Sequence, residues 1–263
     1  MPFVRVRDIT VHYLLEGPED APVVMFSNSL GTSLAIWDTQ AASLRAKYRV
    51  LRYDTRGHGL TDAPDAGDAG YSMEQLADDA IALIQALGLK RVTLCGLSVG
   101  GMLGQNLAAK APEFLNGLIL CDTAAHMNPA VWNERIAIAN KTNSLESLAD
   151  ATLVRWFTPP FHQSNPEAIK GIRNMFVRTP VAGYVGCSHA IRRMDLREDD
   201  KKITTPTLII VGEQDPATTV AEARELHEAI KGSKLVIVPQ AAHIVPIEQG
   251  GAVTKAITEF LGR

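Results

Sequence analysis

A serine between glycines is the group in this chain that most clearly suggests covalent chemistry. The segment Gly96-Leu97-Ser98-Val99-Gly100 matches G-x-S-x-G and stands between an apolar run, 91–95, and a helical pattern, 99–110. In such a strand–turn–helix setting the serine sits on a strained turn, and the glycines let neighbouring backbone approach. The first N–H groups of the helix then face developing negative charge. We therefore predict that Ser98 is a nucleophile.

A serine hydroxyl needs a general base to take its proton. The chain has seven histidines, and we expect the base in a loop after the last predicted strand. His243 lies there, within the small and apolar residues of 240–246. An imidazole without a partner is out of place in such surroundings, so we predict that His243 activates Ser98.

A carboxylate that orients the imidazole would complete the set. Asp215 and Asp122 each stand at the carboxyl end of an apolar run, and Glu213 lies closer to the end of its strand. We favour Asp215, because serine triads in parallel α/β sheets follow the chain order Ser, Asp, His. Asp122 stays open as the alternative, since it could reach His243 from the neighbouring strand.

Acyl transfer also needs donors for the tetrahedral oxyanion. We expect one from the backbone N–H of Val99, directly after the nucleophile. We expect the other from Leu30 N–H, in the polar loop 28–33 that follows an apolar run. The turn 54–59, which contains His58, is interpreted as structural. No segment has the pattern of a phosphate loop or the spacing of a zinc site, so we expect no metal and no cofactor.

The predicted elements bring these groups to one edge of a sheet. Apolar and polar residues alternate at 4–7 and 10–15, which predicts an antiparallel pair of strands. Continuous apolar runs, separated by helical patterns, predict an α/β fold: a mostly parallel sheet of about eight strands with helices on both faces. These runs lie at 23–27, 49–53, 91–95, 118–121, 207–211 and 235–238. The helical patterns between and after them lie at 73–87, 99–110, 220–230 and 253–261.

The region from 124 to 197 breaks this alternation. It contains helix-like pieces and no convincing strand, with turn signals at 158–160 and 165–166. We predict a helical cap, 124–197, inserted into a core made of 1–123 and 198–263; the alternative is that these helices extend the core. The pieces lie at 131–140, 145–157, 166–177 and 180–191.

Composition and charge argue against a nucleic-acid-binding or membrane-spanning protein. The 263 residues include 26 Lys and Arg and 29 Asp and Glu, a formal charge of −3, which argues against a nucleic-acid partner. No apolar run approaches the ~20 residues that span a bilayer, and the N-terminus carries no secretory signal. We therefore expect a soluble cytoplasmic protein without a membrane partner. Its three cysteines, odd in number and far apart, predict reduced, mostly buried thiols: Cys95, Cys121 and Cys187.

Taken together, several segments resemble the 3-oxoadipate enol-lactonases, a family of α/β-hydrolases. The resemblance covers nearly the whole chain. The Asp54 and Ser98 motifs are common to many α/β-hydrolases, whereas the loop Asn28-Ser29-Leu30-Gly31-Thr32 and the cap segments are more specific. Two positions depart from the family, which usually has Met at Val99 and Asn at Asp122. The matching segments are 27–32, 51–59, 95–98, 131–133, 155–158, 190–192 and 195–197.

The resemblance implies an α/β-hydrolase fold and hydrolysis of a small lactone bearing a carboxymethyl group, giving 3-oxoadipate in aromatic-acid breakdown. The carboxylate of that substrate needs a partner, because burying an unpaired charge is costly. We predict Arg192 of the cap as the partner, with Arg155 second, and Trp132 as an apolar wall for the ring. The sequence carries no signal for an oligomeric state.

Two alternative functions are compatible with the same residues. A carboxylesterase, a carbon–carbon bond hydrolase or a perhydrolase would use the same triad and differ only in the cap pocket. A ligand receptor or scaffold protein of the same fold would have slow or absent turnover. The complete Ser–Asp–His set and both oxyanion loops argue against the receptor.

Overall fold

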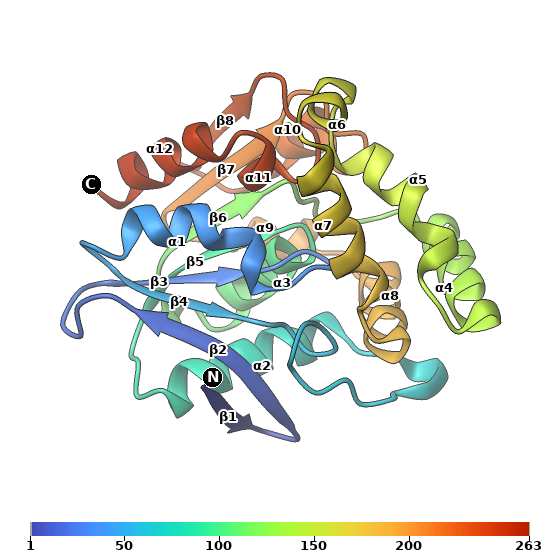
Figure 1. The fold of residues 1–263 in the computed structure, drawn as a ribbon. Coiled ribbons are helices and arrows are strands. Elements are labelled where there is room, and N and C mark those ends of the chain that lie inside the picture. The colour runs from blue at the N-terminus through green and yellow to red at the C-terminus, as the bar shows by residue number, and fades with distance from the viewer. Residues whose placement is uncertain (1, 263) are drawn as a thin grey trace.

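A computed structural model of the protein, which describes residues 2–262, has a sheet of eight strands at its centre (Figure 1). Across the sheet the order is β1-β2-β4-β3-β5-β6-β7-β8. The pairs β1–β2 and β2–β4 are antiparallel, and the other neighbours are parallel, which confirms the predicted mostly parallel sheet. The strands are β1 (Phe3–Val6), β2 (Ile9–Glu16), β3 (Val23–Ser27), β4 (Arg49–Tyr53), β5 (Val92–Leu97), β6 (Leu115–Cys121), β7 (Thr207–Gly212) and β8 (Lys234–Val238).

The central strands explain why the sequence shows apolar runs instead of alternation. Every residue of β3, β5 and β7 is buried, because helices cover both faces of the sheet. The edge strand β8 keeps partly exposed positions. The predicted strand bounds agree with the observed ones to within three residues.

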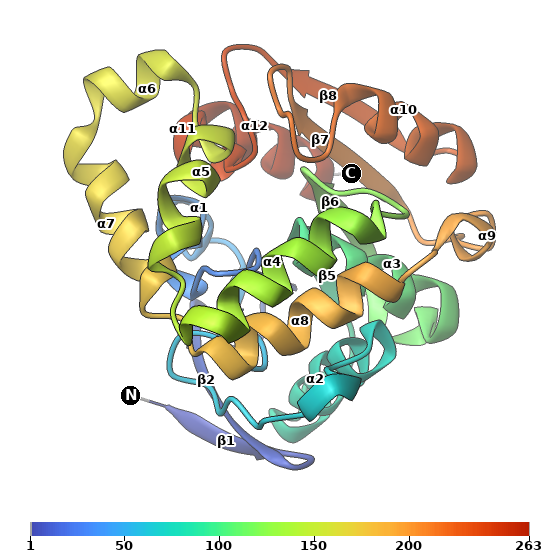
Figure 2. The same ribbon diagram turned by 90° about the vertical axis from the view of Figure 1, so that its right-hand side faces the viewer.

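The helices of the core lie on both faces of the sheet. Helices α1 and α12 pack together on one face, and α2 and α3 pack together on the other (Figure 2). The predicted helices at 73–87, 99–110, 220–230 and 253–261 are observed, whereas the short helices α1, α9 and α11 are not among the predicted elements. The bounds are α1 (Asp38–Leu44), α2 (Met73–Ala86), α3 (Val99–Lys110), α9 (Arg197–Asp200), α10 (Val220–Ala229), α11 (Val245–Glu248) and α12 (Gly250–Leu261).

Among the described residues, five helices lie between β6 and α9 and stand over the carboxyl ends of the parallel strands (Figures 1 and 2). Helices α4 and α8 lie side by side in this layer. From this arrangement we propose that 124–197 form a cap on a core of 1–123 and 198–263, of which residues 1 and 263 lie outside the described part. The helices are α4 (Pro129–Thr142), α5 (Glu146–Trp156), α6 (Pro159–Ser164), α7 (Pro166–Val177) and α8 (Val181–Arg193).

One predicted turn in the cap is the start of a helix. The prolines of the segment Thr158-Pro159-Pro160 occupy the first turn of α6. Proline is tolerated at that position, because the N–H it lacks would have no partner within the helix. The turn signal does mark the break between two helices, at Phe157 and Thr158, but helix α6, which begins there, is not among the predicted elements.

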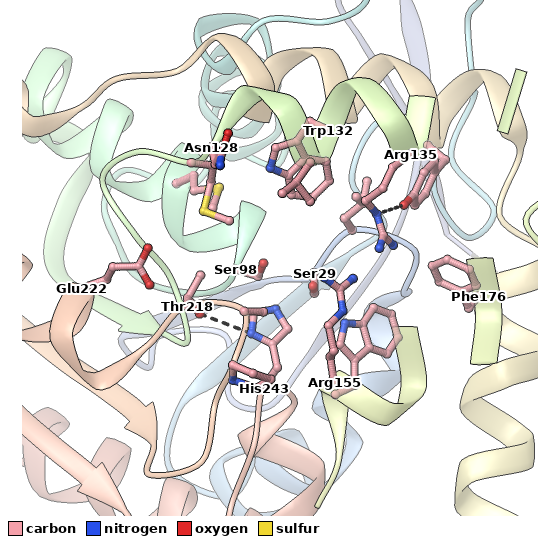
Figure 3. Close-up of a pocket in the computed structure, with 18 residues that line it drawn as sticks. Ser29, Ser98, Asn128, Trp132, Arg135, Arg155, Phe176, Thr218, Glu222 and His243 are labelled. Atoms are coloured by element: carbon pink, nitrogen blue, oxygen red, sulfur yellow. Dashed lines mark hydrogen bonds between the residues drawn. The ribbon is translucent and has the colours of Figure 1, made fainter. Parts of the chain in front are cut away.

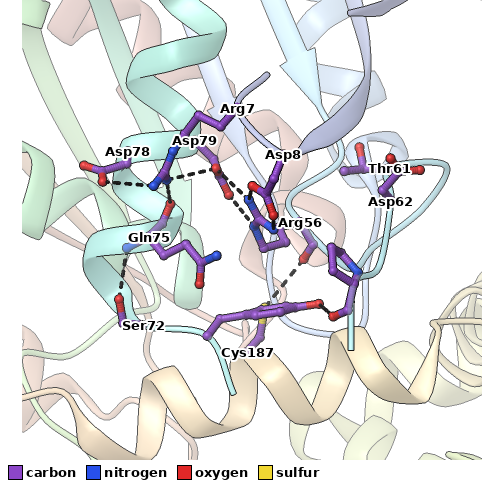
Figure 4. A network of polar contacts seen from close by, with 12 residues as sticks. Arg7, Asp8, Arg56, Thr61, Asp62, Ser72, Gln75, Asp78, Asp79 and Cys187 are labelled. Carbon is purple, nitrogen blue, oxygen red and sulfur yellow. Dashed lines mark hydrogen bonds and ion pairs between the residues drawn. The ribbon is translucent and has the colours of Figure 1, made fainter. Parts of the chain in front are cut away.

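A buried arginine ties the turn after β4 to its surroundings (Figure 4). The Arg56 guanidinium is 1% exposed and pairs with Asp79 on α2, Nε to Oδ2 2.6 Å, and with Asp8, Nη2 to Oδ1 2.5 Å. Asp79 also pairs with Arg7 at 3.2 Å. On the cap side, the Cys187 thiol of α8 lies 3.6 Å from the Arg56 carbonyl oxygen. These contacts hold the N-terminal hairpin, α2 and α8 around one turn.

Within residues 2–262, the structure contains no helix long and apolar enough to cross a membrane.

The three cysteines are buried free thiols, as predicted from their number and spacing.

Candidate active site

Ser98 occupies the turn that joins β5 to α3. Its φ of 55° and ψ of −115° lie in a region that non-glycine residues rarely adopt. A Cβ on Gly100 would lie 2.4 Å from the Ser27 carbonyl oxygen, so this position requires glycine. The Ser98 N–H donates to the Cys121 carbonyl oxygen at 2.9 Å, and its own carbonyl accepts from Thr123 Oγ1 at 2.8 Å. The predicted strand–turn–helix setting of Ser98 is thus present.

His243 and Asp215 meet in the loops after β8 and β7. The distance from His243 Nδ1 to Asp215 Oδ2 is 2.9 Å, and both side chains are buried. Thr218 completes the cluster, since its Oγ1 donates to Asp215 Oδ2 at 2.7 Å and lies 3.3 Å from His243 Nδ1. Burial raises the pKa of Asp215, but the charge of His243 and these hydrogen bonds outweigh it and hold the pKa below its usual value. The carboxylate is therefore ionised beside the imidazole.

Asp122, the alternative acid, has different partners. Its Oδ1 accepts from Gly212 N at 2.8 Å, and its Oδ2 accepts from Val245 N at 3.2 Å. Burial and, next, the charge of Asp215 raise its pKa well above the usual value. Asp122 thus links the β7 loop to the loop that carries His243, and it makes no hydrogen bond to His243 among the described residues.

Ser98 and His243 line the same cavity (Figure 3). Their side chains lie close to each other in the view, and no hydrogen bond joins them within residues 2–262. Catalytic hydrogen bonds are often long in structures without substrate and tighten in the reacting complex. The arrangement places a hydroxyl, an imidazole and a carboxylate in series at the carboxyl edge of the sheet.

Hydrogen bonds from buried polar side chains hold the loop after β3 in place. Asn28 Nδ2 donates to the Thr32 carbonyl at 2.8 Å, and Gly31 N donates to His58 Nε2 at 2.9 Å. Burial lowers the pKa of His58, which favours the neutral ring that can accept this bond. The N–H groups of Leu30 and Val99 donate to no described residue. The turn that contains His58 thus supports the loop in which the sequence places an oxyanion donor.

The cavity has a volume of about 230 Å³ and lies between the loops that carry Ser98 and His243 and the helices α4, α5, α7 and α8. Aromatic side chains from α4, α5, α7 and α8 form much of its wall: Trp132, Trp156, Phe176 and Tyr184. Trp132 therefore lines the cavity, in the position predicted for an apolar wall. Within the described residues, no group of three His, Cys, Asp or Glu side chains could hold a metal ion.

Arg135 and Arg155 both line the cavity, and in the part of the chain that the structure describes only Arg135 has hydrogen-bonding partners. Arg135 Nε donates to Tyr184 Oη at 2.8 Å, and its Nη2 donates to Thr152 Oγ1 at 2.9 Å. Arg155, which points into the cavity (Figure 3), makes no hydrogen bond or ion pair with a described residue. Burial and, next, the charge of Arg135 lower the pKa of Arg155. An unpaired, half-buried guanidinium of this kind is suited to bind an anion.

The structure corrects the prediction for Arg192. Its Nη1 donates to Asn133 Oδ1 at 2.8 Å in an exposed contact between α8 and α4, and Arg192 is not part of the cavity wall. Arg135, which is not among the predicted residues, lines the cavity together with Arg155. The sequence contained a signal for Arg135, because it follows Trp132 by three residues on a helix and so shares its face. Thr218 has a similar signal, three residues after Asp215 in a turn.

Comparison with known proteins identifies the family. The model of the alpha/beta hydrolase fold family matches residues 22–249. The chain is 37% identical to 3-oxoadipate enol-lactonase 2 of Acinetobacter baylyi, over 99% of this chain and 96% of that protein. It is 33% identical to 3-oxoadipate enol-lactonase 1 of the same organism, over 91% and 88% of the two chains. The chain belongs to the 3-oxoadipate enol-lactonase family of α/β-hydrolases.

A crystal structure of an enol-lactonase extends the match to three dimensions. The enzyme from Burkholderia xenovorans LB400 shares 41% sequence identity with this chain, with a TM-score of 0.95 and full coverage of both chains. The resemblance to the enol-lactonase family and the α/β-hydrolase fold, both predicted from sequence segments, are confirmed.

Proposed function

We propose that this protein opens the ring of 3-oxoadipate enol-lactone, with Ser98 as nucleophile, His243 as general base and Asp215 as the carboxylate that orients the base. The cavity carries the proposal. Ser98 and His243 open into a space lined by aromatic rings and by the unpaired cation of Arg155, which suits a small ring with a carboxylate arm. Membership of the enol-lactonase family supports the same substrate.

In the first step, His243 Nε2 takes the hydroxyl proton of Ser98 while Oγ attacks the lactone carbonyl carbon. The N–H groups of Leu30 and Val99 hold the resulting oxyanion. Collapse of the tetrahedral intermediate breaks the bond to the ring oxygen, which leaves as an enolate and receives the proton from the imidazolium. An enolate leaves more easily than an alkoxide, because its charge is delocalised onto carbon. The enol then tautomerises to the ketone.

In the second step, water loses a proton to His243 and adds to the acyl carbon. The ester bond to Ser98 breaks, the imidazolium returns the proton to Oγ, and 3-oxoadipate leaves. Asp215 stabilises the imidazolium in both steps and does not itself take the proton. Its ionised state in the folded protein suits this role.

The carboxylate arm of the substrate is assigned to Arg155, with Arg135 beside it. A carboxylate that enters a half-closed cavity needs charge-assisted hydrogen bonds to replace its water. None of the donors of Arg155 is used by a residue in 2–262, whereas Tyr184 and Thr152 occupy part of Arg135. Trp132 forms an apolar side of the ring pocket. We place the enzyme in the cytoplasm, in the β-ketoadipate pathway of aromatic-acid breakdown.

Steady-state hydrolysis of 3-oxoadipate enol-lactone, followed by the loss of its ultraviolet absorbance, tests the substrate. A neutral p-nitrophenyl ester is measured in parallel, and the Ser98→Ala variant is the blank. We expect kcat/KM above ~10⁴ M⁻¹s⁻¹ on the lactone and a much weaker reaction with the ester. A brisk ester reaction without lactone turnover would keep the triad and overturn the substrate.

A further inference from the structure

The backbone on both sides of His243 is bound to groups that reach the cap. Ala242 N, one residue before it, donates to Glu248 Oε2 at 2.8 Å. Ile244 N, one residue after it, donates to the carbonyl oxygen of Trp156 at the end of α5 at 3.1 Å. The position of the imidazole therefore depends on contacts outside its own loop.

The other oxygen of Glu248 binds the cap directly. Its Oε1 accepts from Thr158 N at 2.9 Å and from the Thr158 hydroxyl. The carboxylate is buried, and each of its oxygens has a donor, one from the His243 loop and one from the cap. Helix α11, which carries Glu248, is itself anchored, since Gln40 Nε2 donates to the Pro246 carbonyl at 3.0 Å.

Thr158 lies three residues after Arg155, across the end of α5. The segment 155–158 thus places Arg155 in the cavity wall and, through Trp156 and Thr158, binds the loop of His243. Figure 2 shows α11 next to the junction of α5 and α6. One buried carboxylate connects the base to the part of the cap that carries the anion-binding arginine.

We propose that Glu248 is a positioning residue, which holds the His243 loop and the Arg155 segment in fixed relation. The proposal rests on the proposed function for the roles of His243 and Arg155. Glutamine at this position has one acceptor oxygen, so its NH₂ group meets an N–H donor on one side. Either the Ala242 contact or the Thr158 contact is then lost, and the two segments separate. Displacements of about 1 Å at a catalytic group lower rates up to about 100-fold.

The test compares Glu248→Gln with Glu259→Gln, a control that makes the same chemical change at an exposed position on α12. Thr158→Val is a milder variant, because it removes the hydroxyl and keeps the N–H. The first readout is the rate at which a fluorophosphonate labels Ser98, which reports on the Ser98–His243 pair without the lactone. The others are kcat and KM for the lactone, and the melting temperature.

All rates are measured well below the melting temperature of each variant. For Glu248→Gln we expect the labelling rate and kcat to fall about tenfold or more, and KM to rise. Thr158→Val should fall between Glu248→Gln and wild type, and Glu259→Gln should match wild type. Labelling and kcat within twofold of wild type, with only a lower melting temperature, would reduce Glu248 to a structural role. If Glu248→Gln does not fold, a wild-type labelling rate in Thr158→Val would overturn the proposal. If the wild-type protein itself is labelled but does not hydrolyse the lactone, the proposed substrate is refuted. The labelling rates of the variants would still test the role of Glu248.

Discussion

Arg155→Met tests the assignment of the substrate carboxylate most directly. The change removes a cation from the cavity wall and keeps a long, flexible side chain. Because Arg155 has no hydrogen-bonding or ion-pair partner among the described residues, the change breaks no polar contact of the cavity wall. A hydrogen bond to a charged group contributes about 1.5–3 kcal/mol, so kcat/KM for the lactone should fall by a factor of about 10–150.

Stability should respond in the opposite sense. Burial and the charge of Arg135 lower the pKa of Arg155, so the folded state disfavours its charged form. Arginine is charged in the folded and unfolded states at neutral pH, and this cost to folding is therefore constant there. Arg155→Met should leave the melting temperature unchanged or raise it, a trade of stability against function common in active sites.

The assay compares the lactone with a neutral p-nitrophenyl ester in wild type, Arg155→Met and Arg192→Ala. Arg192→Ala is the matched control, since it removes a cap arginine that does not line the cavity. Arg155→Met should lose activity on the lactone and keep it on the ester, and Arg192→Ala should keep both. Equal losses on both substrates in Arg155→Met, or a lactone-specific loss in Arg192→Ala, would refute the assignment.

Three further outcomes are expected. Ser98→Ala should abolish lactone turnover with an unchanged melting temperature, and a pure variant that keeps a tenth of the rate would contradict the nucleophile. Asp215→Asn should lower kcat by roughly 10⁴-fold through the wrong imidazole tautomer, far more than Asp122→Asn, and steady-state kinetics showing the reverse ranking would make Asp122 the acid. Burial and, next, the charges of neighbouring aspartates raise the pKa of Asp200 from 3.8 to about 7, so folding stability should fall as pH rises between these values. Asp200→Asn should therefore raise the melting temperature more at pH 8 than at pH 5, and equal shifts would contradict the buried, raised pKa.

The departure from the family at Asp122 has a physical account in the structure. Each carboxylate oxygen of Asp122 accepts one backbone N–H, from Gly212 and from Val245. An asparagine could accept only one of them, so here the carboxyl group joins the two loops that carry Asp215 and His243. The sequence left Asp122 and Asp215 as alternatives, because both follow buried strands and only side-chain geometry separates them.

Local pattern was enough to predict most elements and the three proposed catalytic residues. Strands buried on both faces have continuous apolar sequences, which can be recognised without a structure. Ser98, Asp215 and His243 each lie in a loop after such a run. The errors concern short helices. Helix α1 has seven residues and helices α9 and α11 have four each, too few for a periodic pattern to stand out, and α6 begins with prolines that resemble a turn.

Short segments of the sequence suffice to predict the fold, the family and the order of the proposed reacting groups along the chain, because each segment forms one strand, turn or helix. Which residues of the helices α4–α8 line the cavity depends on tertiary packing. Helical periodicity shows that residues share a face, but which face meets the cavity depends on how the cap helices pack on each other and on the core. For this reason Arg192 bonds Asn133 outside the cavity, while Arg155 lines it and Glu248 joins the cap to the loop of His243.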